Sequence, residues 1–235
     1  MRMSQITTMS PSPMDPSVDT PAKPVMRGWL HLGFAPVALI VGVIFTALAP
    51  TLLGRVGCGV YTLAAVQLFG TSAAYHRGTW SPTTLAIFRR IDHSNIFVFI
   101  AGTYTPLSLV MLEGPTRITV LVLVWVIAIL GIAFRVLWLD APRWLYTFLY
   151  VAMGFAAVGW FPQFWEAGGP AVVVLIVTGG LIYTLGAVAY ATKRPNPSQK
   201  WFGFHEVFHS ATILAALCHL IAIGLTVFSV GAGAA

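Results

Sequence analysis

The chain has 235 residues, of which 57% are hydrophobic and only 9% are charged, whereas about 25% of the residues of a soluble domain are charged. This composition excludes an ordinary soluble domain and predicts an all-α integral membrane protein. The net charge of +6 does not indicate nucleic-acid binding, because the basic residues are scattered among the connections and form no patch. Cys58 and Cys218 both lie inside apolar stretches, which is typical of buried cysteines without a redox role.

The elements in chain order begin with a polar segment. Residues 1–28 are rich in Ser, Thr and Pro, so we expect a disordered tail there, and they lack the apolar core of a cleaved signal peptide. Seven apolar stretches follow, each long enough to cross a hydrocarbon core about 30 Å thick. The sequence therefore predicts a bundle of seven transmembrane helices over residues 29–230 and a short C-terminal tail at 231–235. The stretches are 29–50, 56–76, 91–112, 118–138, 143–163, 170–191 and 203–230.

The basic residues predict the orientation of the bundle. Of the 13 Lys and Arg residues, only Arg55 and Arg117 fall in the connections that would lie outside the cell. The others fall in the tail and in the alternate connections, which the positive-inside rule assigns to the cytoplasm. We therefore expect a cytoplasmic N-terminus and an external C-terminus. The end of the second stretch and the starts of the third and seventh then share the cytoplasmic side of the bilayer.

Three histidines carried by these ends form a candidate metal site. His205 and His209 are four residues apart, so they project from one face of a helix and can bind one ion. His76, at the end of the second stretch, supplies a third nitrogen. Three histidines and a water form the open tetrahedral site of a catalytic zinc ion, which would activate that water as a nucleophile. The sequence thus predicts Zn²⁺ as the cofactor.

Two further residues are candidates for catalysis. Asp92 is one of only two carboxylates within the apolar stretches, and it could accept the proton of the zinc-bound water or orient that water. Ser72 lies one helical turn before His76 and could hydrogen-bond the water or a substrate oxygen. The sequence does not decide between the two roles of Asp92.

The remaining histidines are expected to be structural. A single histidine in a membrane helix more often hydrogen-bonds a neighbouring helix than a metal, and we expect this of His31 and His219. His219 is about 15 Å further along its helix than His209, too far to share its ion. His93 neighbours Asp92 but points about 100° away from it on the helix, so we expect it to support the site or the fold.

The same residues allow three other functions to be considered. The segment from His205 to His209 reads as H-E-x-x-H, the motif in which Glu206 would be the general base of an intramembrane metallopeptidase. Against this reading, no soluble catalytic domain is present and the other candidate residues come from distant helices. A retinal protein is excluded because the lysines all lie outside the stretches, at 23, 193 and 200. A bis-histidine haem protein remains an alternative that visible absorbance would reveal.

Four motifs in this order closely resemble the hemolysin III proteins, which are bacterial members of the progestin and adiponectin receptor (PAQR) superfamily. The resemblance covers nearly all of residues 28–230. The motifs are Ser72-x3-His76, residues 90–97 (RIDHSNIF), residues 102–106 (GTYTP) and residues 203–209 (GFHEVFH).

The resemblance implies a seven-helix protein of the bacterial plasma membrane with a cytoplasmic N-terminus. It also implies zinc at His76, His205 and His209, with Asp92 and Ser72 beside it. Because the superfamily includes alkaline ceramidases, it favours a zinc-dependent hydrolase of a lipid amide or ester, with a membrane lipid as substrate or ligand. A non-enzymatic membrane sensor, or a pore-forming cytolysin with a structural zinc, remains the alternative. The resemblance does not predict the oligomeric state.

Overall fold

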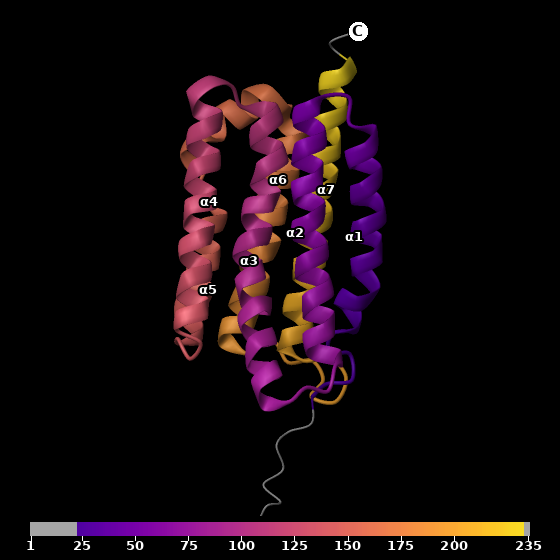
Figure 1. Ribbon diagram of the computed structural model, residues 1–235, viewed down its shortest axis with the longest axis vertical. Coiled ribbons are helices and arrows are strands. Elements are labelled where there is room, and N and C mark those ends of the chain that lie inside the picture. Colours follow the sequence, from indigo (N-terminus) through magenta and orange to yellow (C-terminus); the bar gives the residue numbers. More distant parts are fainter. Residues whose placement is uncertain (1–22, 233–235) are drawn as a thin grey trace, which may run out of the picture.

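A computed structural model of the chain describes residues 23–232, and within them it is an all-α bundle (Figure 1). Residues 1–22 of the predicted tail and residues 233–235 lie outside the described residues. The elements are α1 (Trp29–Leu48), α2 (Leu52–Arg77), α3 (Pro82–Met111), α4 (Gly114–Leu137), α5 (Arg143–Gly154), a 3₁₀ helix η1 (Val158–Trp160), α6 (Phe161–Thr192) and α7 (Phe204–Ala232).

Six helical segments within residues 23–232 are long and apolar enough to cross a membrane, which identifies an all-α, multi-pass membrane protein. One of them, Arg143–Thr192, is 50 residues long. It contains a non-helical residue at Gly169, and Arg143 at its start donates a hydrogen bond to the carbonyl of Tyr190 near its end (3.2 Å). This segment therefore folds back on itself. Its two arms correspond to the predicted stretches 143–163 and 170–191, whereas a crossing of the membrane by each arm stays a prediction.

Helix α3 begins nearer to the N-terminus than the apolar pattern predicts, at Pro82 rather than at residue 91. Ser81 accepts a hydrogen bond from the backbone N–H of Thr84 (3.2 Å), and proline is favoured in the first turn of a helix. These local signals start the helix while the sequence is still polar. Arg89 and Arg90 thus belong to α3 and not to a connection.

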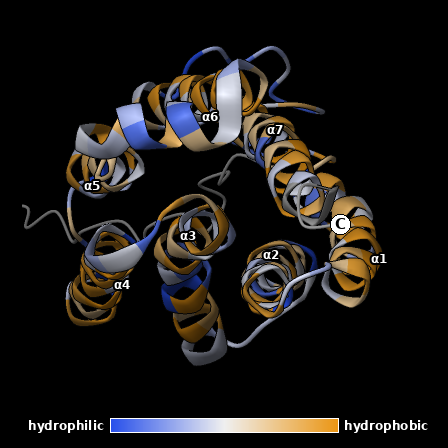
Figure 2. Ribbon diagram, turned by 90° about the horizontal axis from the view of Figure 1, so that it is seen from above, coloured by the Kyte–Doolittle hydropathy of each residue, from blue (hydrophilic) through white to orange (hydrophobic). Residues whose placement is uncertain are grey.

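Helix α3 lies at the centre of the bundle, in contact with α2, α4, α5, α6 and α7. Seen from above in Figure 2, the other helices lie around α3 on three sides, and most of their residues are hydrophobic. Helices α2 and α3 approach each other closely, because a Cβ atom at Gly57 would lie only 2.6 Å from Cα of Pro106. Such small residues let membrane helices pack backbone to backbone. This contact sets α2, which carries Ser72 and His76, directly against the helix that carries Asp92.

The residues just before α1 contact the connection between α6 and α7. The backbone N–H of Val25 donates to the carbonyl of Lys200 (2.9 Å), and that of Met26 donates to the carbonyl of Trp201 (3.2 Å). These residues form the last part of the predicted tail. The described structure therefore ties the N-terminal segment to the start of α7, next to the predicted histidine site.

Candidate metal centre

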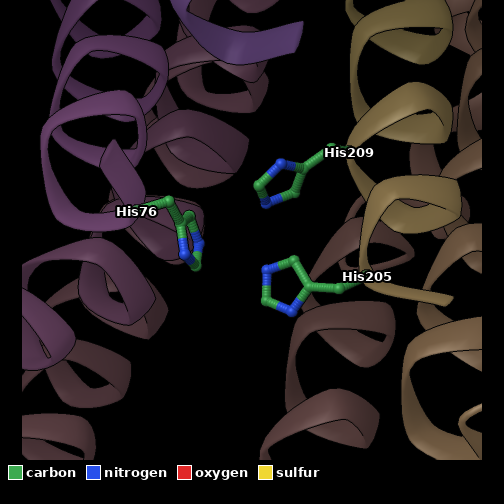
Figure 3. Close-up of side chains that lie close together, drawn as sticks. All are labelled: His76, His205 and His209. Carbon is green, nitrogen blue, oxygen red and sulfur yellow. The ribbon is translucent and has the colours of Figure 1, made fainter. Parts of the chain in front are cut away.

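The three predicted ligands come together at one end of the bundle. His76 lies in the last turn of α2, and His205 and His209 lie in the first turns of α7. One ring nitrogen from each lies within 4.8 Å of the other two. Figure 3 shows the three rings pointing toward a common point between the two helices. The predicted convergence of these residues is confirmed.

The donor set fits a metal ion. His209 is buried and the other two rings are partly buried. Nε2 of His76 and Nδ1 of His209 are shielded from solvent and have no hydrogen-bond partner among the described residues, an arrangement that is costly unless another group binds them. Zinc ligands at 2.0–2.1 Å in tetrahedral geometry lie roughly 3.4 Å apart. Small side-chain rotations would therefore bring these nitrogens onto one ion.

A fourth imidazole supports this group. The ring of His31, on α1, stacks on the ring of His209 with centroids 3.8 Å apart and planes 14° apart. Phe69 packs edge-on against the other side of His31 (5.0 Å). Neither ring nitrogen of His31 has a hydrogen-bond partner among the described residues. The contact of His31 with α7 is thus this ring stack, and the hydrogen bond to a neighbouring helix that we expected of it stays a prediction.

The candidate catalytic residues lie beside the histidines. Asp92 and Ser72 line one small cavity of about 40 Å³ together with His31, His205 and His209. Ser72 is buried, and the side chain of Asp92 is only 14% exposed. A water molecule needs about 10–15 Å³ of such volume, so the cavity can hold a nucleophilic water next to both side chains. The catalytic roles of Asp92 and Ser72 stay predictions.

The other two histidines have structural contacts. Nδ1 of His93 donates to the carbonyl of Arg89 (2.8 Å), and the carbonyl of His93 accepts a hydrogen bond from the hydroxyl of Tyr150 (3.0 Å). Nε2 of His219 donates to the carbonyl of Ile176 on α6 (3.1 Å), which confirms the interhelical hydrogen bond expected of it. Neither belongs to the three-histidine group.

Glu206, the acid of the H-E-x-x-H motif, is engaged elsewhere. It is fully buried, one carboxylate oxygen forms an ion pair with Arg27, and the other accepts a hydrogen bond from the backbone N–H of Gly203 (2.8 Å). Glu206 thus caps the start of α7 and holds the N-terminal segment. No pattern in the sequence indicates this ion pair, because Arg27 lies 179 residues away from Glu206, in the predicted tail.

A larger apolar chamber adjoins the small cavity. It has a volume of about 130 Å³ and lies between residues of α3, α5, α6 and α7. Most of the residues that line it are apolar, and they include Phe99, Leu107 and Ile176. Six residues line both spaces, so the chamber continues toward the histidines. These shared residues are Leu68, Ile96, Tyr150, Ala187, Phe208 and Thr212.

Comparison with known proteins identifies the family to which the chain belongs. The profile of the family described as Haemolysin-III related matches residues 20–220. The chain belongs to the haemolysin-III family. Similar proteins include the Hemolysin-3 homolog of Bacillus subtilis (strain 168), 32% identical over 168 residues, which are 71% of this chain and 78% of the relative. Hemolysin-3 of Bacillus cereus is 31% identical over 65% of this chain and 69% of its own length.

The haemolysin-III chain is also related to the adiponectin receptors of the PAQR superfamily. It is 26% identical to the adiponectin receptor protein of Drosophila melanogaster over 186 residues, which are 68% of this chain and 40% of that receptor. The resemblance that the sequence motifs indicated is therefore confirmed. Within this haemolysin-III protein, the motif residues His76, His205 and His209 form a buried group that could bind a metal.

Proposed function

We propose that this haemolysin-III protein is a multi-pass protein of the bacterial plasma membrane that binds zinc through His76, His205 and His209 and hydrolyses an amide or ester bond of a membrane lipid. One observation carries the proposal: His205 and His209 of the histidine group line a cavity that Asp92 and Ser72 also line, and an apolar chamber adjoins that cavity. A metal-dependent site for lipid hydrolysis needs these three parts together, namely a metal, polar groups for proton transfer and an apolar space for the chain.

The proposed mechanism assigns a task to each polar side chain. A zinc ion held by three imidazoles supplies a polarised water at neutral pH. Asp92, whose carboxylate lines the same small cavity, accepts the proton of the attacking water and passes it to the leaving nitrogen or oxygen as the C–N or C–O bond breaks. Ser72 donates its hydroxyl hydrogen to the carbonyl oxygen of the scissile bond, where negative charge develops. The adjoining chamber binds the acyl chain and keeps bulk water away from it.

Three other functions were compared with the same residues. The Bacillus cereus relative is named Hemolysin-3, which favours a cytolysin, but a pore needs a continuous polar wall and the chamber beside the histidines is lined mainly by apolar groups. A metallopeptidase of the H-E-x-x-H type needs a free glutamate, whereas Glu206 is paired with Arg27 and Gly203. A sensor with a structural metal would share the ligands but would have no turnover.

The test is the metal content of the detergent-purified protein, measured by mass spectrometry. We expect about one zinc per chain in the wild type and loss of zinc in His76→Ala and in His205→Ala/His209→Ala. His219→Ala is the matched control and should keep its zinc, because His219 bonds to Ile176 and not to the group. A folded wild type without stoichiometric metal would contradict the proposal.

The second stage measures turnover. The zinc-loaded protein is incubated with a fluorescent ceramide and with a fluorescent glycerolipid ester, and release of the fatty acid is followed. Hydrolysis of either lipid by the wild type, lost in His76→Ala, is the expected result. One zinc per chain without hydrolysis of either class would favour the sensor.

A further inference from the structure

Two polar side chains face each other across helices in the apolar chamber. Tyr183 lies on α6 and His219 on α7, and their ring centroids are 5.6 Å apart. Both residues line the chamber. The hydroxyl of Tyr183 and Nδ1 of His219 are shielded from solvent, and neither has a hydrogen-bond partner among the described residues. Buried polar atoms are rarely left in this state.

The other polar side chains of the chamber wall are satisfied. Their hydroxyl groups all donate to backbone carbonyls, at distances between 2.6 and 3.0 Å. Within the described part of the chain, Tyr183 and His219 therefore hold the only unpaired polar atoms on this wall. The satisfied hydroxyls are those of Thr103, Tyr104, Tyr150, Thr184 and Thr212.

The chemistry of the pair suits one kind of ligand group. Nε2 of His219 must carry a hydrogen, because its partner, the carbonyl of Ile176, only accepts. In the neutral ring, Nδ1 is then an acceptor. The hydroxyl of Tyr183 can donate or accept. A ligand hydroxyl can donate to His219 and accept from Tyr183, whereas a methylene group would leave both unpaired.

Tyr183 and His219 lie at a defined distance from the metal centre. Phe208, Thr212 and His219 lie on one face of α7, because residues four or seven positions apart on a helix project in nearly the same direction. All three line the chamber. His219 lies about 15 Å further along α7 than His209. An acyl chain whose carbonyl lies at the histidine group and whose tail enters the chamber would bring its middle carbons to Tyr183 and His219.

We propose that Tyr183 and His219 form a specificity site for a hydroxyl group in the middle of an acyl chain. This inference deepens the proposed function, because it names hydroxylated acyl lipids as the preferred class for the same site. Without such a hydroxyl, binding of the chain leaves two buried polar groups unpaired, and sites built in this way discriminate strongly against analogues that lack the group.

The experiment measures binding, so that its result does not depend on hydrolysis. Detergent-purified wild-type protein is equilibrated with a fluorescent fatty acid, which is displaced by 12-hydroxyoctadecanoic acid, 2-hydroxyoctadecanoic acid or octadecanoic acid. We expect the 12-hydroxy acid to bind about tenfold more tightly than octadecanoic acid, which is about 1.4 kcal/mol. The 2-hydroxy acid, whose hydroxyl would lie near the histidine group, should gain little from the pair.

Two variants test whether the preference for the 12-hydroxy acid depends on Tyr183. Tyr183→Phe removes only the hydroxyl and should reduce the tenfold preference to about threefold or less. Thr184→Val is the matched control on the same helix and the same wall. Its hydroxyl is already bonded to the carbonyl of Gly180 (2.8 Å), so the preference should persist.

Three outcomes would overturn the proposal. They are equal binding of the 12-hydroxy acid and octadecanoic acid by the wild type, a full preference in Tyr183→Phe, and failure of the fluorescent acid to bind at all. The first two would mean that buried water alone satisfies Tyr183 and His219. A protein that prefers the 12-hydroxy acid but hydrolyses neither test lipid would instead contradict the proposed function and leave this binding site in place.

Discussion

Asp92 is the only carboxylate among the described residues that line the small cavity beside the histidines, and this position allows a test of its role. Asparagine has the same shape and can still orient a water, but it cannot accept a proton. We therefore expect Asp92→Asn to keep its zinc and to lower the rate of lipid hydrolysis by roughly 10²–10⁴-fold. Metal content and fatty-acid release are measured on the same sample. A variant that retains both zinc and the full rate would remove Asp92 from proton transfer.

The ion pair between Arg27 and Glu206 leads to a prediction about stability. Glu206 is fully buried and the side chain of Arg27 is 17% exposed, so Arg27→Met would leave an unpaired buried charge. We expect a loss of about 3–5 kcal/mol in the free energy of unfolding. Adding Glu206→Gln should recover part of this loss, because glutamine is neutral and can still accept the hydrogen bond from Gly203.

This stability prediction is checked by thermal unfolding of the two variants and the wild type in detergent. The wild type should have the highest midpoint and Arg27→Met the lowest. A double variant that unfolds below Arg27→Met would show that the carboxylate of Glu206 is stabilised by groups other than Arg27.

At this scale the sequence predicted contacts that follow from helix geometry and missed those that depend on tertiary packing. His205 and His209 share a face because of their spacing, and the alternation of the helices brings His76 to the same end. The stacking of His31 on His209 requires the relative positions of α1 and α7, which no local pattern encodes. The same holds for the ion pair of Arg27 with Glu206, which depends on the packing of the N-terminal segment against α7.

Among the elements, the contact of α2 with α3 is the one that positions the proposed catalytic residues. A Cβ atom at Gly57 would meet the backbone of Pro106 at 2.6 Å, whereas one at Gly70, on the same helix, would meet nothing within 4 Å. We therefore expect Gly57→Ala to lower the free energy of unfolding by about 1–3 kcal/mol through overpacking. Gly70→Ala is the control and should be neutral or stabilising by up to about 1 kcal/mol.

The same pair of variants links packing to the metal centre. Because α2 carries His76 whereas His205 and His209 lie on α7, a displacement of α2 in Gly57→Ala should also weaken zinc binding. Thermal midpoints and zinc retention during dialysis against a chelator measure the two effects. Equal behaviour of Gly57→Ala and Gly70→Ala would mean that the close approach of α2 and α3 is not needed for the site.

The helix boundaries show which signals a sequence carries about its elements. The break between the last two arms was predicted at residues 163–169, and the structure has its non-helical residue at Gly169, followed by Pro170. Glycine and proline thus marked this break, but the predicted stretch 143–163 was too long as one helix, because α5 ends at Gly154 and a short 3₁₀ helix precedes α6. The start of α3 was predicted too late, since an apolar pattern detects only the part of a helix suited to lipid, while Ser81 and Pro82 start the helix in a polar segment.

In the molecule as a whole, the histidine group and most basic residues of the connections lie toward one end of the bundle. The N-terminal segment from residue 23 on, the α2–α3 connection and the α6–α7 connection meet at this end, and the last turns of α7 lie at the other (Figure 1). Arg55 and Arg117 lie near the opposite end, at the starts of α2 and α4. By the positive-inside rule, this uneven distribution of basic residues predicts that the histidine end of the bundle faces the cytoplasm.

The orientation can be tested with single cysteines in a background that carries Cys58→Ala and Cys218→Ala. Gln199→Cys lies in the exposed α6–α7 connection at the histidine end, and Glu113→Cys is exposed between α3 and α4 at the other end. If the basic end is cytoplasmic, a membrane-impermeant maleimide added to spheroplasts should label Glu113→Cys and leave Gln199→Cys unlabelled until the membrane is opened. The reverse pattern would place the histidine site on the outer side. Water and protons would then reach Asp92 from outside the cell, and the proposed hydrolase would act on lipids of the outer leaflet.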